Sequence, residues 1–248
     1  RGRRFAKGGK VGGGVAGKRR SHYRLMITAG PTREPIDPVR FISNHSTGTL
    51  GYTLARLARA RGHEVTLVSG PTELACPPGV RRMDVETAGQ MHQAVVRFFS
   101  KMDALIMSAA VADFRPVRVA SHKIKRSGAA GGLRLWQLEL IENPDIVADA
   151  ARRRKPHQVV VGFALETEGL LPNARRKLKA KNLDAIVATK LSNRPNGRRP
   201  FGNGPVDGAI LARRGHAGSF RSMKKTTLAV RILSTVEKLL ARRQALTR

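Results

Sequence analysis

The feature that most restricts the fold of this chain is a regular alternation of short apolar runs with amphipathic stretches of helical period. Residues 104–109 form a nearly unbroken apolar run, which is typical of a parallel strand covered on both faces. Residues 87–99 instead place apolar side chains three and four positions apart, which predicts an amphipathic helix. We expect strands at residues 25–29, 64–68, 104–109, 133–141, 159–162, 185–188 and 207–212, helices at residues 52–61, 87–99 and 228–240, and a Lys/Arg-rich helix that ends before residue 182.

Strands that alternate with helices of about 10–15 residues predict an α/β fold with a doubly wound, mostly parallel, Rossmann-like sheet. The alternation at residues 133–141 follows a Gly-rich stretch and predicts an antiparallel β arm that projects from the sheet. No internal repeat is visible, so we expect a single domain over residues 24–248. Residues 1–23 are rich in Gly and cations and lack periodicity, so we interpret them as a flexible basic tail.

The charge of the chain is strongly positive, with 47 Lys and Arg against 17 Asp and Glu and a formal net charge of +30. Residues 1–24 contain nine cations and no acid, and residues 213–248 contain ten cations and a single acid, Glu237. The part between these ends is still basic. Such a surplus is typical of proteins that work near polyanions such as phosphorylated ligands or RNA, although a G+C-rich genome that favours Arg would give the same composition.

Several classes of protein are excluded or disfavoured by simple features. No apolar run approaches the roughly 20 residues that cross a bilayer, so we expect no membrane-spanning helix. One cysteine, Cys76, forms neither an intramolecular disulfide nor a thiolate metal cluster, which fits a reducing compartment. We therefore expect a cytoplasmic protein, or an organellar one if residues 1–23 are the remnant of a transit segment. The first strand is not followed by the G-x-G-x-x-G fingerprint, which disfavours a Rossmann oxidoreductase.

Polar residues follow the predicted strands, where α/β sheets bind their ligands. The cluster at residues 44–49 precedes a helix and could present backbone N–H groups to an anion, although an ordinary helix cap has the same composition. Asp113 follows the strand at 104–109 and could accept from a sugar hydroxyl or a base amine. The triplet at residues 123–125 has two lysines on one face, which suits either a phosphate clamp or a solvated edge. Lys177 and Lys181 share a helical face, where they repel each other unless an anion lies between them.

The order of these motifs resembles one family. The segments ITAGPTREPIDPVRFISNHSTG, LVSGP, AAVADFRP, KIK, NPDIV, GFALET and KNLD are similar to those of 4′-phosphopantothenoylcysteine synthetases (phosphopantothenate–cysteine ligases), the synthetase half of a bifunctional coenzyme A biosynthesis protein. The resemblance runs from about residue 25 to residue 240. In that family a nucleoside triphosphate, CTP or ATP, activates 4′-phosphopantothenate as an acyl-nucleotide with loss of pyrophosphate. The amine of cysteine then attacks to form an amide.

The resemblance implies a set of site residues, ligands and partners. Asn44 would hold the acyl-nucleotide intermediate, and Lys123 would serve the second step. CTP, or ATP, would act with Mg²⁺, and the protein would be a homodimer. The sequence departs from the family pattern at Thr49, where many relatives have lysine. The residues that would contact the nucleotide are Met107, Ser108, Ala109, Asp113, Lys123, Pro144, Asp145, Ile146, Val147, Phe163, Lys177 and Lys181.

The net charge keeps one alternative of a different class open. A synthetase-like fold that has lost its activity could serve as an RNA-binding component, for example of an organellar ribosome. Weak nucleic-acid binding through the basic ends is expected to depend steeply on salt in either case.

Overall fold

A computed structural model describes residues 22–125, 136–191, 204–213 and 220–246. Eight strands form one sheet in the order β12-β11-β10-β9-β6-β1-β4-β5, in which all neighbours from β10 to β5 are parallel and β11 and β12 are antiparallel. The mostly parallel sheet that the sequence predicts is therefore confirmed. The strands of this sheet are β1 (Arg24–Ala29), β4 (Glu64–Ser69), β5 (Arg81–Asp84), β6 (Ala104–Met107), β9 (Val159–Glu166), β10 (Ala185–Lys190), β11 (Val206–Ala212) and β12 (Arg221–Met223).

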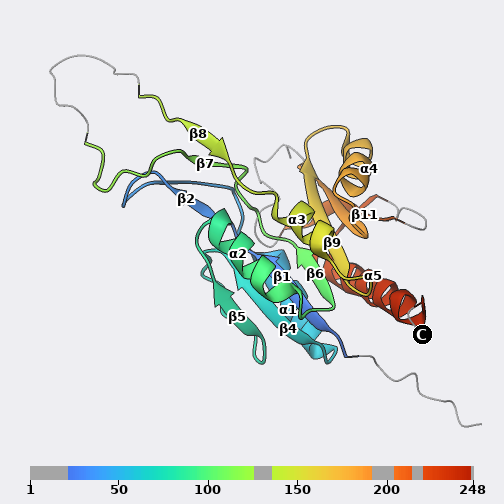
Figure 1. The fold of residues 1–248 in the computed structure, drawn as a ribbon. Helices are drawn as coiled ribbons and strands as arrows, with labels where there is room; N and C mark the ends of the chain where they lie inside the picture. The colour runs from blue at the N-terminus through green and yellow to red at the C-terminus, as the bar shows by residue number, and fades with distance from the viewer. Residues whose placement is uncertain (1–21, 126–135, 192–203, 214–219, 247–248) are drawn as a thin grey trace, which may run out of the picture.

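Helices cover both faces of the sheet, as the doubly wound prediction requires (Figure 1). One face packs against α1 (Thr49–Ala60) and α5 (Lys225–Leu246), and the other against α2 (Ala88–Phe99), α3 (Ile146–Arg153) and α4 (Leu170–Ala180). Side chains of β1 alternate between the two layers: Leu25 and Ile27 join the first core, and Met26 joins the second. Each core is buried, which removes apolar surface from water on both sides of the strands.

Helix ends agree with local sequence signals where such signals exist. The helix predicted at residues 87–99 is α2, and its N-cap Thr87 forms a reciprocal capping box with Gln90. The helix predicted at residues 52–61 begins three residues earlier, at Thr49. No side chain caps α1, and its N-cap residue Gly48 has a positive φ of 73°. Glycine adopts this conformation without strain, and the sequence therefore gives no polar cap from which to read the start.

Helix α1 lies unusually close to the sheet at Gly51. A Cβ atom placed on Gly51 would lie 2.5 Å from Cβ of Ala29 in β1 and 2.9 Å from Oγ of Ser108. Both distances are far below an ordinary van der Waals contact of about 3.5–4.0 Å. Only glycine fits at this crossing.

An arm projects from one end of the sheet (Figure 1). It contains the antiparallel pair β7 (Phe114–Pro116) and β8 (Leu140–Glu142), with the hairpin of β2 (Arg33–Pro35) and β3 (Phe41–Ser43) beside it. The antiparallel arm is confirmed, but the strand predicted over residues 133–141 is confirmed only at residues 140–141: residues 136–139 are not a strand, and residues 133–135 lie outside the described part. The partner strand β7 pairs over three residues only, and beyond it the backbone N–H of Val117 donates to the carbonyl oxygen of Glu139 at 3.0 Å.

Helix α5 packs against α1 and bonds to the residues that follow α1. Glu237 of α5 accepts hydrogen bonds from Arg61 at 3.0 Å and lies 3.0 Å from Nε2 of the buried His63. Tyr23, which we assigned to the tail, is 4% exposed and packs in the core beside His63. Residues 1–21 of the predicted tail lie outside the described residues. Among those described, no helix is long and apolar enough to cross a membrane.

Candidate active site

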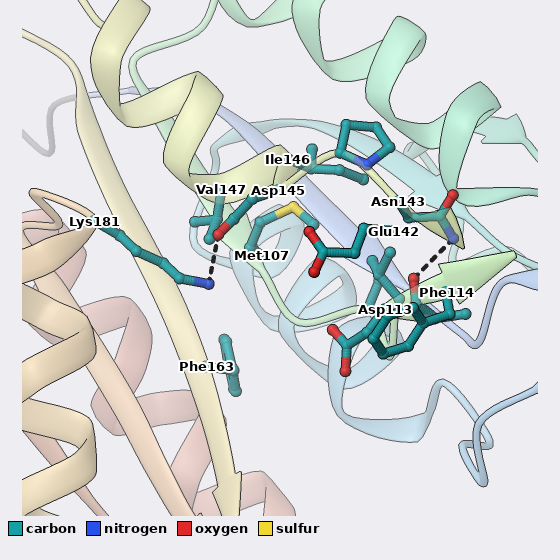
Figure 2. A pocket seen from close by; sticks show the side chains of 14 residues that line it. Met107, Asp113, Phe114, Glu142, Asn143, Asp145, Ile146, Val147, Phe163 and Lys181 are labelled. Carbon is teal, nitrogen blue, oxygen red and sulfur yellow. Dashed lines mark hydrogen bonds and ion pairs between the residues drawn. The ribbon is translucent and has the colours of Figure 1, made fainter. Parts of the chain in front are cut away.

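A cavity of about 520 Å³ opens at the carboxyl ends of β6 and β9, next to the start of α3 (Figure 2). This is the edge of a parallel sheet at which ligands bind in α/β folds. Apolar and polar side chains share its wall, and four of the lining residues carry charge: Asp113, Glu142, Asp145 and Lys181. The complete lining is Met107, Ala109, Val111, Ala112, Asp113, Phe114, Glu142, Asn143, Pro144, Asp145, Ile146, Val147, Phe163 and Lys181.

Two side chains fix the start of α3 at this cavity. Asp145 is the N-cap of α3 and accepts a hydrogen bond from the backbone N–H of Ala148 at 3.1 Å. Its other oxygen, Oδ2, lies 2.8 Å from Nζ of Lys181, which comes from the end of α4. Lys181 therefore reaches the cavity as a member of an ion pair, and a phosphate that binds it must compete with Asp145. Both side chains are partly exposed, so this exchange has a small energetic cost.

Asn143 holds the loops around the cavity together. Its side-chain amide donates to the carbonyl oxygen of Ala112 at 2.9 Å, and its own carbonyl oxygen accepts from Arg115 at 3.0 Å. The backbone N–H of Asn143 donates to the carbonyl oxygen of Asp113 at 2.8 Å. These bonds join the segment after β6 to the segment before α3. The sequence predicts nucleotide contacts at the next four residues, 144–147, and the structure adds Asn143 to the cavity wall.

The charge of the cavity wall differs from the cation-rich site that the sequence predicts. Three carboxylates face one ammonium group, and Figure 2 shows Asp113 and Glu142 on the side away from the pair of Lys181 and Asp145. A triphosphate needs additional positive charge in such a site. Asp113 and Glu142 would hold a Mg²⁺ ion that arrives with a nucleotide, because magnesium is usually bound through one or two carboxylates together with substrate phosphates.

The carboxylates fit an ion that enters with the nucleotide. Within the described ranges, no group of three or more His, Cys, Asp or Glu side chains could hold a metal ion by itself. Asp113 and Glu142 are both exposed at the cavity and offer oxygen ligands of the right kind. The donor set therefore suits a magnesium–nucleotide complex rather than a closed protein cage.

Nine of the twelve residues predicted to contact the nucleotide line this one cavity: Met107, Ala109, Asp113, Pro144, Asp145, Ile146, Val147, Phe163 and Lys181. The remaining three do not. Ser108 turns its hydroxyl to the carbonyl oxygen of Thr28 at 2.5 Å. Lys177 forms an ion pair with Glu166 at 2.7 Å, which explains why it tolerates Lys181 four residues away. Lys123 lies outside the cavity wall.

Sequence reasoning missed five lining residues: Val111, Ala112, Phe114, Glu142 and Asn143. Each of the five lies within two positions of a predicted site residue. The segment after β6 and the segment before α3 lie together because they contain β7 and β8, which pair with each other beside the cavity. Recognition of that pairing would have identified these residues. That pairing is not visible in either segment alone.

Asn44 lies at the edge of the same region, after β3. Its side-chain amide donates to the carbonyl oxygens of Ala110 at 3.3 Å and Val111 at 2.9 Å. Asn44 thus contacts the loop that leaves β6, one wall of the cavity. Both bonds come from Nδ2, so a ligand that accepts from this amide competes with the two carbonyl oxygens. The longer bond, to Ala110, is the weaker of the two.

A buried carboxylate anchors the segment that carries Lys123. The side chain of Asp37 has no exposed surface and accepts from the backbone N–H groups of Val39 and Arg40 at 2.8 Å and of Ile124 at 3.1 Å. Arg40 bonds to Asp37 and donates to the carbonyl oxygen of Ile124 at 2.8 Å. The hydrogen bonds from Arg40, Ile124 and Val39 hold the pKa of Asp37 well below its usual value.

This anchor ties the exposed Lys123 to the turn between β2 and β3, although residues 123–125 do not form a strand. The sequence contains a signal for part of it, because an Asp before a Pro in a turn commonly accepts from the backbone two and three residues later. The bond to Ile124 spans 87 residues and has no local signal.

Asp149 attaches α3 to α2 behind the cavity. It accepts from His92 at 2.8 Å, from Arg152 at 3.1 Å and from Arg153 at 3.0 Å. The hydrogen bond from His92, followed by those from the two arginines, lowers the pKa of Asp149 to about 2 against the opposing effect of burial. The hydrogen bond between Asp149 and His92 therefore fixes the first turn of α3 against α2.

Comparison with known proteins places the chain in a family. Residues 20–240 match the model of the DNA/pantothenate metabolism flavoprotein C-terminal domain, named DFP. The chain is 47% identical over 176 residues to the coenzyme A biosynthesis bifunctional protein CoaBC of Escherichia coli (strain K12). That match covers 71% of this chain and 43% of the relative, so the chain spans about two fifths of the relative's length.

Two solved structures share the fold. The crystal structure of the C-terminal domain of a CoaBC superposes with a TM-score of 0.71 and 33% identity, and covers 91% of this chain and 100% of that one. A mutant of Cab2 in complex with phosphopantothenate-cysteine superposes with a TM-score of 0.68 at 18% identity, over 90% of this chain and 89% of that one. Because the family model matches nearly the whole described fold, the chain belongs to the family of the DNA/pantothenate metabolism flavoprotein C-terminal domain.

Proposed function

We propose that this chain is a phosphopantothenate–cysteine ligase of coenzyme A biosynthesis. A nucleoside triphosphate activates the carboxylate of 4′-phosphopantothenate as an acyl-nucleotide and releases pyrophosphate. The amine of cysteine then attacks the acyl carbon, and the nucleoside monophosphate leaves as the amide forms. The observation that carries the proposal is that nine residues predicted from the family motifs line one cavity at the ends of β6 and β9.

The cavity residues divide into groups with different tasks for a nucleotide. Met107, Val147 and Phe163 provide an apolar wall for a planar base. Asp113 accepts from a ribose hydroxyl or a base amine, and Lys181 exchanges Asp145 for a phosphate oxygen. Mg²⁺ bound with the nucleotide would offset the charge of the phosphates against the carboxylates of the wall.

The reacting carboxylate belongs near Asn44, between the cavity and the arm. An amide donor there stabilises the oxyanion of the acyl-nucleotide without adding a competing nucleophile. Lys123, held on its anchored segment, is assigned to the second step, where positive charge favours departure of the nucleotide. Positioning of the two substrates supplies a large part of the rate enhancement.

The finer properties are part of the proposal. We infer CTP as the preferred nucleotide with ATP as the alternative, Mg²⁺ as the metal, and a homodimeric, cytoplasmic enzyme. The two substrates are supported by the relatives: CoaBC proteins by their names act in coenzyme A biosynthesis, and a Cab2 structure of this fold holds phosphopantothenate-cysteine. The RNA-binding alternative has no support among these relatives and depends on net charge alone.

The test is pyrophosphate release by the full chain with 4′-phosphopantothenate and Mg²⁺, with CTP or ATP, and with or without cysteine. We expect release limited to about one equivalent per site without cysteine, and continuous turnover with it. Absence of nucleotide-dependent release under all four conditions would refute the ligase. Retention of RNA at physiological salt by that same inactive chain would favour the alternative.

A matched pair of variants separates the two steps. Lys123→Gln is expected to release its first equivalent of pyrophosphate and to form no amide. Lys125→Gln removes the same charge two residues away, from another exposed position, and is expected to turn over within a few-fold of the wild type. Equal amide formation by both variants would remove Lys123 from the mechanism.

A further inference from the structure

A second cavity, of about 650 Å³, lies near the amino end of the parallel strand β10, whereas the candidate active site lies at the carboxyl ends of β6 and β9. This second cavity is formed by the end of α3, the residue before β10, the residue after β11 and the last turns of α5, near the C-terminal end marked in Figure 1. Four of its lining residues are arginines and one is a carboxylate, Asp184. The others are apolar. The lining is Arg154, Pro156, Asp184, Arg213, Leu239, Arg242, Arg243, Ala245 and Leu246.

Three of the four guanidinium groups are oriented by hydrogen bonds to neighbouring segments, and the fourth, Arg242, is exposed. The side chain of Arg154 is 12% exposed, and its guanidinium donates to the backbone carbonyl of Asn182. Arg213 donates to the side-chain oxygen of Asn182, and Arg243 donates to Asp184 and to the carbonyl oxygen of Pro156. Three arginines from three different elements are thus oriented around one spot, which lowers the entropy that a ligand must remove from them.

The described groups of this cavity do not balance in charge. The side chain of Asp184 is 7% exposed. It accepts hydrogen bonds from Arg243 and from the backbone N–H of Val160 at 2.8 Å, and it forms an ion pair with Arg154, whose Nε lies 3.8 Å away. Burial lowers the pKa of Arg154, and the neighbouring charges of Arg243 and Arg213 lower it further, against the attraction of Asp184. Cations are therefore crowded here beyond what one carboxylate offsets.

Helix ends account for part of this charge only. The carbonyl oxygens at the end of a helix attract cations, and Arg154 follows the end of α3. Arg213 comes from the segment after β11, and its partner is the side chain of Asn182, which follows the end of α4. Three apolar side chains, Leu239, Ala245 and Leu246, also line the cavity, and Leu246 is 79% exposed. A purely structural cluster of charges does not need such side chains.

We propose that this cavity binds a small organic phosphate that carries an apolar segment next to its phosphate group. Guanidinium groups bind phosphate oxygens in pairs, and a net charge of three positive units among the described lining groups matches a ligand of two or more negative charges. The apolar side chains of the lining give such a ligand an advantage over inorganic phosphate. This site is separate from the nucleotide cavity, and its test does not depend on ligase activity.

The experiment is calorimetric titration of the full chain with hexyl phosphate at physiological ionic strength. We expect one site at the arginine cavity, with at least about tenfold weaker binding of inorganic phosphate and of hexanol. The double variant Arg213→Gln with Arg242→Gln removes two charges and is expected to weaken hexyl phosphate about tenfold or more. Arg154 is left intact, because its bond to Asn182 holds the backbone.

Two controls decide where the ligand binds. Arg56→Gln with Arg176→Gln removes two exposed arginines from α1 and α4 and should leave the affinity within about twofold. Lys181→Gln alters the nucleotide cavity and should also leave it unchanged. Undetectable binding, equal losses in the two arginine doubles, or loss in Lys181→Gln would overturn the proposal. Binding of an RNA oligomer that needs Arg213 and Arg242 while hexyl phosphate does not bind would likewise overturn it.

Discussion

Replacement of Gly51 by alanine tests the close contact between α1 and the sheet. The added Cβ would lie 2.5 Å from Cβ and 3.1 Å from Cα of Ala29, and 2.9 Å from Oγ of Ser108. Ala29 is fully buried in β1, between β4 and β6, and its backbone cannot withdraw. Helix α1 must therefore move outward by about 1 Å to restore a normal carbon–carbon distance.

Two effects of opposite sign determine how Gly51→Ala changes the free energy of unfolding. Glycine in a helix is about 1 kcal/mol less favourable than alanine, so Gly51→Ala gains that amount in helix propensity. Overpacking of a well-filled core costs about 1–3 kcal/mol, and this site lies near the upper limit because two atoms would approach within 3 Å. We expect a net loss of about 1–2 kcal/mol in the free energy of unfolding, or a fall in Tm of roughly 2–8 °C.

Gly89, in the first turn of α2, is the matched control. A Cβ there would have one neighbour, Oγ1 of Thr87 at 3.7 Å, which is an ordinary contact. Gly89→Ala is therefore expected to raise the free energy of unfolding by about 0.5–1 kcal/mol. Urea and thermal unfolding of the two variants measure the difference. If Gly51→Ala is as stable as the wild type, or if both variants shift in the same direction, the reasoning from the crossing distance is wrong.

Three further predictions address the acid response, the anchor and the arm. Because the pKa of Asp149 is lowered to about 2 in the folded state, its contribution to stability is complete above the unfolded value of about 4 and is lost as pH falls from 4 towards 2. Asp149→Asn should flatten the stability curve in that window, and an unchanged curve would exclude this carboxyl. Asp37→Asn should accelerate hydrogen exchange at the backbone N–H of Ile124 and lower amide formation, since the anchor of the Lys123 segment is broken; protection equal to the wild type would show that other contacts hold the segment. The arm leaves Trp136 53% exposed beside other apolar side chains, so we expect a homodimer in light scattering, and a mass of 27.0 kDa at micromolar concentration would contradict it.

The elements that the sequence predicts are those whose burial imposes a pattern. β1, β6 and β9 have apolar residues on both faces, and α2 has one apolar stripe and a polar cap, so each could be recognised locally. β5 is a short strand at the edge of the sheet, with the sequence RRMD, and its residues carry no such pattern. β5 is a strand because it pairs with β4, and its own sequence contains no signal for that pairing.

In the candidate site, too, local patterns could be predicted and contacts between distant segments could not. The motifs predicted most of the residues that surround the cavity, because those residues lie at the ends of recognisable strands. They did not predict which cations are already paired. Lys177 meets Glu166 from a neighbouring strand, and Lys181 meets Asp145 from the start of a different helix. Pairing across the fold depends on tertiary geometry, which has no signal within one motif.

The contact between α5 and the first third of the chain has a consequence for how the molecule is made. Glu237 completes its bond to Arg61 across 176 residues of sequence. At a synthesis rate of roughly 5–20 residues per second, the layer that α5 covers waits about 10–35 seconds after Arg61 is translated. During that interval the side of α1 that packs against α5 lacks its partner, although α1 already covers β1 and the opposite face can pack against α2. The apolar contacts of α5 with α1 and β9 therefore form only after most of this domain has been synthesised.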